Sequence, residues 1–139
     1  MTDTMIRKSI YLNASPEQVW DYLTDPDKLV LWFHKPTAPL EQGNELKMYG
    51  AESGNLLIWG TVKTARRPSY IEYTFVIGPM GDAVSLVKWT LDPVAGGTRL
   101  SLEHSGLPQG AEGFGLTLNL DEGWDEHMGR MRAHLHDSA

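Results

Sequence analysis

The 139-residue sequence contains no cysteine. The chain can therefore form no disulfide, offer no thiolate to a metal ion and use no cysteine nucleophile. Concentrated positive charge is also missing, because the 12 Lys and Arg residues are scattered and the net charge is −6 at pH 7. Arg7-Lys8 and Arg66-Arg67 are too small as clusters to hold a phosphate backbone against a net negative field. We therefore expect no nucleic-acid partner.

Long apolar runs are absent as well. No stretch of about 18 apolar residues could cross a bilayer as a helix, and the first residues, MTDTMIRKSIYLNA (1–14), lack the apolar core of a secretory leader. We expect a cytoplasmic protein with no integral membrane segment. The composition, 41% hydrophobic and 22% charged, and the absence of a low-complexity linker predict a single domain over residues 1–139.

Alternation of apolar and polar residues predicts an antiparallel sheet with one buried face. The expected strands are separated by turns rich in Gly and Pro and cover residues 6–14, 44–50, 55–65, 69–77, 83–93 and 97–106. Within LLIWGTV (56–62) both faces are apolar, so the pattern leaves open whether Ile58 or Trp59 points inward. The apolar face of such a sheet needs a covering element.

Two short helices are predicted after the first strand. Ser15 and Gln18 form a capping box with Pro16 at the first helical position, and this helix should end near Thr24. Asp25, followed by another proline, repeats the start signal for a second short helix.

The last segment, NLDEGWDEHMGRMRAHLHDSA (119–139), predicts the covering helix. Asn119 and Glu122 have the spacing of a capping box, which places the helix start near Leu120. A period of 3.6 residues gathers its apolar residues into one stripe, made of Trp124, Met128, Met131 and Leu135. We therefore expect an amphipathic helix that lies over the sheet.

The histidines of this helix do not form a metal-binding pattern. His127 and His134 share a flank, but seven residues of helix correspond to about 10 Å of rise, whereas zinc ligands lie about 2.1 Å from the metal. Glu126 and Arg130 instead have the i,i+4 spacing of a surface ion pair. We expect no metal site, no cofactor and no catalytic nucleophile.

A glycine-rich segment, SGLPQGAEGFGLTLN (105–119), precedes the covering helix. Glycine permits motion at the cost of order. Two interpretations remain open here, namely a flexible gate in which Phe114 swings over a cavity mouth, and a long solvent-exposed loop.

Four segments carry a resemblance to a known family: SPEQVWDYLTDPDKLVLWF (15–33), GTVKTARRPSYIEYTF (60–75), GGTRLSLEHSG (96–106) and GWDEHMGRM (123–131). In these segments the chain resembles the START-like, helix-grip (SRPBCC) superfamily and, within it, the AHSA-like family named after the activator of the heat-shock chaperone ATPase. The resemblance implies an α+β fold, in which a curved antiparallel sheet of about six strands wraps around a long C-terminal helix. Superfamily members bind lipids, sterols, polyketides or other apolar molecules in a cavity between sheet and helix, and some catalyse cyclisation or hydrolysis.

The resemblance makes a set of inward-facing residues candidates for a ligand cavity. The set comprises Trp32, Tyr73, Phe75, Val87, Trp89, Leu100, Leu102, His104, Phe114, Trp124, Met128 and Met131. The pattern does not separate a cavity wall from an ordinary packed core. Buried Tyr73 and His104 each need a partner, which a backbone carbonyl, a water or a ligand oxygen could supply. His34, after the second short helix, is expected to be exposed.

Three functions from different classes follow from these features. The first is non-enzymatic binding of a small apolar or aromatic molecule in a cavity of several hundred cubic ångströms. The second is a protein-interaction module like a chaperone regulator, with a filled core and an exposed apolar patch. The third is a cofactor-free cyclase or hydrolase that uses Tyr73 or His104, one of which would lie in the cavity without a protein partner. An exposed sheet edge would also allow a homodimer.

Overall fold

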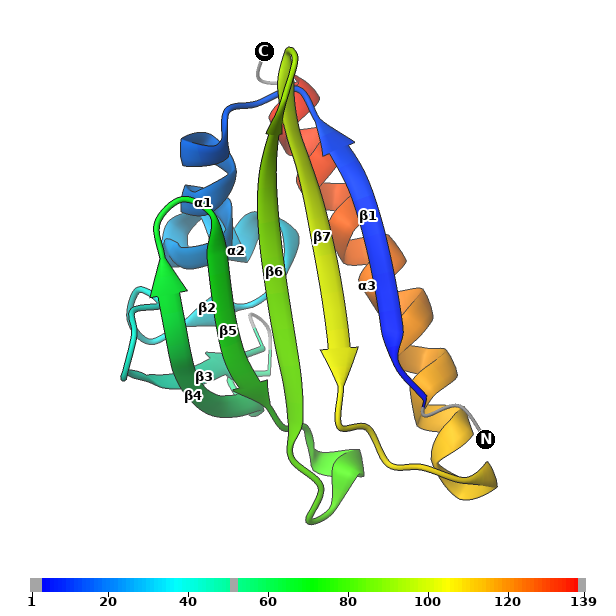
Figure 1. The fold of residues 1–139 in the computed structure, drawn as a ribbon. Coiled ribbons are helices and arrows are strands. Elements are labelled where there is room, and N and C mark those ends of the chain that lie inside the picture. The colour runs from blue at the N-terminus through cyan, green and yellow to red at the C-terminus, as the bar shows by residue number, and fades with distance from the viewer. Residues whose placement is uncertain (1–3, 51–52, 138–139) are drawn as a thin grey trace.

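The structure is a computed structural model that describes residues 4–50 and 53–137. Its elements in chain order are β1 (Ile6–Leu12), α1 (Pro16–Thr24), α2 (Pro26–Trp32), β2 (Lys35–Pro36), β3 (Glu45–Tyr49), β4 (Leu56–Arg66), β5 (Tyr70–Phe75), the 3₁₀ turn η1 (Gly78–Met80), β6 (Ser85–Val94), β7 (Gly97–Ser105) and α3 (Ala111–Asp137). The strands form one antiparallel sheet in the order β1-β7-β6-β5-β4-β3-β2, which curves around α3 (Figure 1). The predicted α+β arrangement is confirmed, with the two-residue β2 as an additional strand.

The inner face of the sheet follows the alternation of the sequence. Buried and half-buried residues alternate along β6 from Ser85 to Asp92 and along most of β7, because successive strand residues point to opposite faces. Ile58 is the inward residue of β4, with 3% of its surface exposed, whereas Trp59 is 36% exposed. The apolar side chains of this face form the core together with the buried side of α3.

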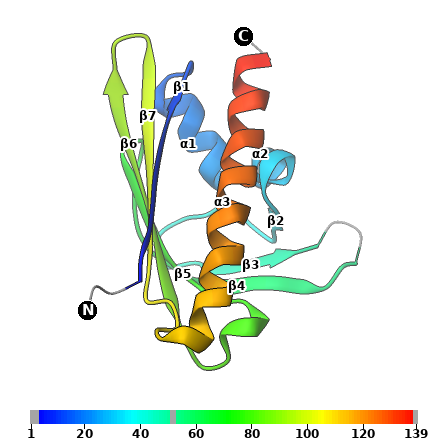
Figure 2. The same cartoon turned by 90° about the vertical axis from the view of Figure 1, so that its right-hand side faces the viewer.

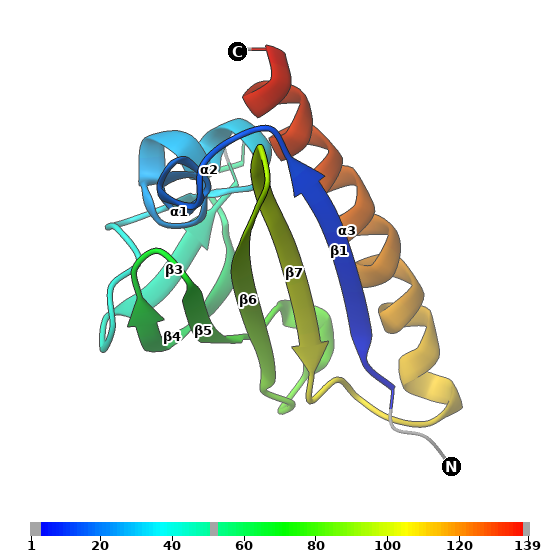
Figure 3. The same cartoon turned by 45° about the horizontal axis from the view of Figure 1, so that its top comes forward.

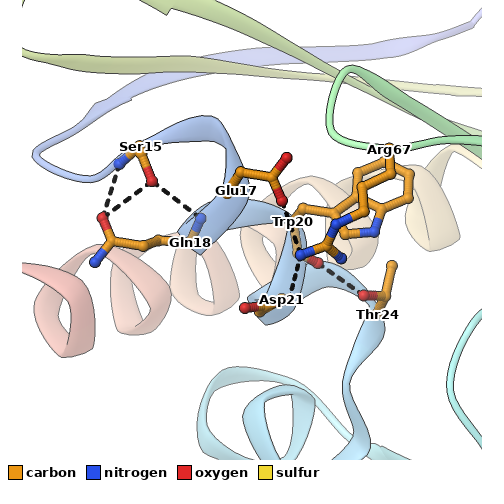
Figure 4. Close-up of polar contacts among 7 residues, drawn as sticks. All are labelled: Ser15, Glu17, Gln18, Trp20, Asp21, Thr24 and Arg67. Atoms are coloured by element: carbon orange, nitrogen blue, oxygen red, sulfur yellow. Dashed lines mark hydrogen bonds and ion pairs between the residues drawn. The ribbon is translucent and has the colours of Figure 1, made fainter.

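The two short helices lie side by side at the end of the sheet nearest the C-terminus of α3 (Figure 3). The Ser15 hydroxyl accepts a hydrogen bond from the Gln18 backbone N–H at 3.2 Å, and the Gln18 side chain accepts one from the Ser15 N–H at 2.9 Å, as Figure 4 shows. The predicted capping box is therefore confirmed, and Asp25 caps α2 through its side chain.

An arginine from the turn after β4 is attached to the outer side of α1. Arg67 Nη2 lies 2.8 Å from Glu17 Oε2 and 3.1 Å from Asp21 Oδ1 (Figure 4). All three side chains are about half exposed, so solvent screens these ion pairs.

The long helix runs along the sheet next to β1, as the turned view in Figure 2 shows. Its predicted stripe is confirmed, because Trp124, Met128, Met131 and Leu135 are all buried. Lys8 of β1 adds ion pairs to α3, with its Nζ 2.9 Å from Asp121 Oδ1 and 2.8 Å from Asp125 Oδ1. None of the helices in the described part of the chain is long and apolar enough to cross a membrane.

The predicted start of this helix is wrong. The helix begins at Ala111 rather than near Leu120, and Asn119 lies within it instead of capping it. The glycine-rich segment is therefore largely helical, and only residues 106–110 connect it to β7. Both the gate and the loop interpretations fail for residues 111–119, and Phe114 is held on the helix with 54% of its surface exposed.

Tertiary contacts explain why helix forms across these glycines. Gly113 lies so close to Pro108 that a Cβ at this position would overlap the Pro108 carbonyl group. Thr117, one turn later, is buried, and Leu116 and Leu120 pack against the core. Burial of these side chains offsets the cost of glycine in a helix, which is about 1 kcal/mol per residue.

Candidate functional site

A cavity of about 570 Å³ lies between α3 and the part of the sheet formed by β4 and β5. Its wall combines the end of α2, the start of β4, the end of β5, η1 and the middle of α3. The lining residues are Phe33, His34, Asn55, Leu56, Leu57, Ile58, Phe75, Ile77, Gly78, Pro79, Asn119, Leu120, Gly123, Trp124 and His127.

Aromatic rings form the wall where α2 meets α3. Phe33 follows the last residue of α2, where the chain turns away from helical geometry, and its ring stacks on Trp124 with 5.3 Å between centroids. Phe75 approaches Trp124 from the sheet, with 5.9 Å between centroids. Trp124 is itself held by a hydrogen bond from its indole N–H to His104 Nδ1. The wall therefore has a defined shape before any ligand binds.

Two histidines lie beside this aromatic wall. The rings of His34 and His127 are 5.5 Å apart between centroids, and Phe33 contacts both rings at 4.8 Å. Burial is the main cause that lowers the pKa of His127 to about 4; the hydrogen bond with the Trp32 carbonyl opposes this shift, and the positive charge of Arg130 adds to it. Burial and then the charge of Arg130 also lower the pKa of His34. Both rings are therefore neutral at pH 7.

Sequence reasoning missed both histidines. The expectation that His34 is exposed is wrong, because the side chain is half-buried and lines the cavity. The sequence pattern indicates for His127 only that it cannot share a metal ion with His134. The helical period placed it on a flank, and only the packing of α2 against α3 makes that flank part of a cavity. Among the described residues, no three His, Asp or Glu side chains are placed to hold a metal ion.

Few of the predicted cavity residues line this cavity. Phe75 and Trp124 do so, whereas Phe114 lies on the exposed side of α3. The remaining ones are buried in the core, with at most 2% of their surface exposed: Trp32, Tyr73, Val87, Trp89, Leu100, Leu102, His104, Met128 and Met131. The hydrophobic core between sheet and α3 and the cavity are therefore neighbours, and Trp124 and Phe75 belong to both.

His104 is the centre of a buried hydrogen-bond chain. Its Nδ1 accepts a hydrogen bond from the Trp124 indole N–H at 3.0 Å, so the proton of the neutral ring must be on Nε2. Nε2 then donates to Ser85 Oγ at 2.7 Å, and the Ser85 hydroxyl donates to the Phe75 carbonyl oxygen at 2.5 Å. Burial lowers the pKa of His104 to about 4, which keeps this chain in one protonation state at neutral pH.

Tyr73 also has a hydrogen-bond partner within the protein. Its hydroxyl oxygen accepts a hydrogen bond from the Trp89 indole N–H at 3.0 Å, and burial raises the pKa of the hydroxyl. Neither Tyr73 nor His104 lines the cavity. The free polar group that a cyclase or hydrolase would need at one of these positions is therefore not present in the described structure.

A curved antiparallel sheet closed by a long C-terminal helix, with an apolar cavity between them, defines a helix-grip protein. Residues 13–136 match the family described as "Activator of Hsp90 ATPase homolog 1-like protein", and the chain belongs to this family. The AHSA-like resemblance inferred from the sequence is thus confirmed. A comparison with curated proteins gave no match.

Solved structures share the fold at low sequence identity. Protein MLL2253 from Mesorhizobium loti is 22% identical, with a TM-score of 0.85 and 98% of each chain covered. DynU16, described as a protein of the dynemicin biosynthetic locus, is 22% identical with a TM-score of 0.83; the match covers 97% of this chain and 48% of that one. The Aha1 dimer from Colwellia psychrerythraea is 18% identical with a TM-score of 0.77, and 95% of this chain and 96% of that chain are covered. At these identities the likeness establishes the fold alone.

Proposed function

We propose that the protein binds a small apolar or aromatic molecule in the cavity beside Trp124. The observation that carries this proposal is the cavity itself, whose volume of about 570 Å³ lies within the usual range for small-molecule sites. Its wall is mostly apolar and aromatic, with the few polar groups that such sites use to orient a ligand. The helix-grip superfamily, whose members bind apolar molecules, and the biosynthetic context given for DynU16 support the same function.

Filling the cavity from α3 tests this proposal. Gly123 lines the cavity, and a Cβ added there would meet no atom within 4 Å. We expect Gly123→Leu to project a side chain into the space that the ligand would occupy. The matched control is Gly115→Leu, because Gly115 lies on the same helix, is equally open to a Cβ and does not line the cavity. Both changes replace glycine by a good helix former, so neither should unfold the protein.

The readout is binding of the neutral fluorophore N-phenyl-1-naphthylamine, followed by its emission. Gly123→Leu should weaken binding by about tenfold or more, equivalent to about 1.4 kcal/mol, whereas Gly115→Leu should bind as the wild type does. If the two variants bind the fluorophore equally well, the cavity beside Trp124 is not the binding site.

An interaction between protein surfaces is a second candidate function, favoured by one feature of α3. Phe114 and Leu118 lie one helical turn apart and are 54% and 48% exposed, which is unusual for large apolar side chains that neighbour each other. A homodimer through this face predicts that sedimentation becomes concentration-dependent in the wild type and that Phe114→Glu abolishes this dependence. A monomer at all concentrations would reject the homodimer.

A further inference from the structure

Two histidines lie next to each other in the cavity wall. Among the described residues that line it, His34 and His127 are the titratable ones, and no Asp, Glu, Lys or Arg belongs to the wall. Within the same part of the chain, neither ring nitrogen of His34 makes a hydrogen bond, and the bonds of His127 all involve Nδ1. The cavity therefore presents imidazole nitrogens that have no hydrogen-bond partner in the described structure, and a polar group of a ligand could bind them.

Arg130 contacts Nδ1 of His127 and can therefore fix the tautomer of this ring. His127 Nδ1 lies 3.0 Å from the Trp32 carbonyl oxygen and 2.9 Å from Arg130 Nη1. A carbonyl only accepts and a guanidinium only donates, so a neutral ring bonds to one of these groups at a time. When Nδ1 carries the proton it donates to Trp32. When Nδ1 accepts from Arg130, the proton is on Nε2 and that nitrogen becomes a donor.

In the second tautomer, both His127 Nδ1 and the Trp32 carbonyl oxygen keep a hydrogen-bond partner. Arg130 Nη1 also lies 3.5 Å from the Trp32 carbonyl oxygen, and Nη1 carries two hydrogens. It can donate one to His127 Nδ1 and the other to the carbonyl. The change of tautomer therefore turns His127 Nε2 into a hydrogen-bond donor without leaving the buried carbonyl unsatisfied.

We propose that the ligand carries an anionic group, a carboxylate in the simplest case, which binds between His34 and His127 and is stabilised by Arg130 acting through His127. This inference rests on the proposed binding function and specifies the chemical class of its ligand. A cationic group would find no carboxylate in the described wall. An anion instead selects the tautomer with the Nε2 donor and gains a hydrogen bond assisted by charge.

The charged groups around His34 and His127 have opposite signs, and the positive Arg130 is the one in direct contact with His127. From α3, Arg130 contacts the His127 ring directly, whereas Glu126 faces Arg130 through an ion pair of 3.7 Å with both side chains largely exposed. The neighbouring residues of α2 contribute the Phe33 ring and the Trp32 carbonyl, and the described lining residues of β4, β5 and η1 carry no charge. A bound anion would oppose the effect of burial and favour protonation of His34, whereas His127 stays neutral with its proton on Nε2. Binding of the anion should therefore take up protons.

A pair of matched compounds tests the inference. 2-Naphthoate and 2-naphthamide have nearly the same shape, but only the first is an anion between pH 6 and pH 8. Isothermal titration calorimetry should show 2-naphthoate binding about tenfold more tightly than 2-naphthamide at pH 6, as expected for one hydrogen bond assisted by charge. The affinity for 2-naphthoate should fall as the pH is raised to 8, because His34 loses the proton that the anion favours, whereas the affinity for 2-naphthamide should not change.

Two variants distinguish the specific effect of Arg130 on binding from the effect of the net charge of the protein. Arg130→Gln should abolish the preference for 2-naphthoate over 2-naphthamide. Arg132→Gln removes the same charge from the same helix, but Arg132 is exposed and outside the cavity, so the preference should persist. Circular dichroism and thermal unfolding of both variants show that they are folded.

Each other outcome rejects a defined part of the argument. If 2-naphthamide binds as tightly as 2-naphthoate, or if Arg130→Gln keeps the preference, the anionic inference is wrong and the binding function stands. The same holds if N-phenyl-1-naphthylamine binds but 2-naphthoate does not displace it. If the fluorophore itself does not bind, both the proposed function and this inference are wrong.

Discussion

His104 should make the stability of this protein sensitive to mild acid, and His104→Gln should remove that part of the sensitivity. The ring is fully buried, and both of its nitrogens are committed to the chain from Trp124 to Ser85 in the neutral form. Burial lowers its pKa in the folded state to about 4, whereas an unfolded histidine titrates near 6.5. Between these two pH values the unfolded chain binds a proton that the folded protein does not, so the free energy of unfolding falls as the pH falls.

The magnitude follows from the size of the pKa difference. A shift from 6.5 to about 4, at about 1.4 kcal/mol for each pKa unit, amounts to about 3 kcal/mol once the pH is below both values. This contribution to stability is present above pH 6.5. About 2 kcal/mol of it should be lost between pH 7 and pH 5, which is a large part of the stability of an ordinary domain.

Urea unfolding at pH 7, 6 and 5 measures this contribution as a difference between proteins. Other groups that titrate, His127 among them, are present in both the wild type and His104→Gln and cancel in the comparison. His104→Gln should be less stable at pH 7 but should lose about 2 kcal/mol less than the wild type on going to pH 5. Ile71→Val is the control, because it removes a buried methyl group at a cost of about 1 kcal/mol and leaves His104 in place. An equal loss in the wild type and in His104→Gln would refute the reasoning.

Further predictions concern the cap of α1 and two glycines. Ser15→Ala removes the hydroxyl that caps α1, and urea unfolding should show a loss of about 1 kcal/mol; no change would mean that the capping box with Gln18 contributes nothing in this context. Gly60→Ala would bring a Cβ against the Thr74 carbonyl oxygen and should destabilise the protein by about 1–3 kcal/mol. Gly129 lies on α3, and a Cβ added there would meet no atom within 4 Å. Gly129→Ala should therefore raise the melting temperature through a gain in helix propensity of about 1 kcal/mol. A similar loss of stability in both glycine variants would contradict this account of Gly60.

The elements of the fold were predictable where local physics decides them. The capping box of Ser15 and Gln18 fixes the start of α1 because it pairs backbone groups within four residues. The stripe from Trp124 to Leu135 follows from the period of the helix, and the alternation along β6 and β7 follows from the pleat of a strand. Each of these features depends on residues that are neighbours in the sequence.

The start of α3 and the position of the cavity depended on contacts between distant segments. Glycine at position 113 indicates flexibility when only its neighbours are considered, but here it permits contact with the Pro108 carbonyl group and lets the helix begin at Ala111. The histidines gave no signal, because His34 follows α2 and His127 lies on a flank of α3, more than 90 residues away.

The sequence by itself determined the order of the main helices and strands, the buried side of most of them and the family to which the chain belongs. Only the tertiary structure decided that Tyr73 and His104 belong to a satisfied core and that Phe33, His34 and His127 meet at a cavity. The physical reason is that secondary structure and burial follow from local periodicity. A cavity, in contrast, exists where surfaces from distant elements fail to fill the space between them, and that space depends on how α2, α3 and the sheet pack together.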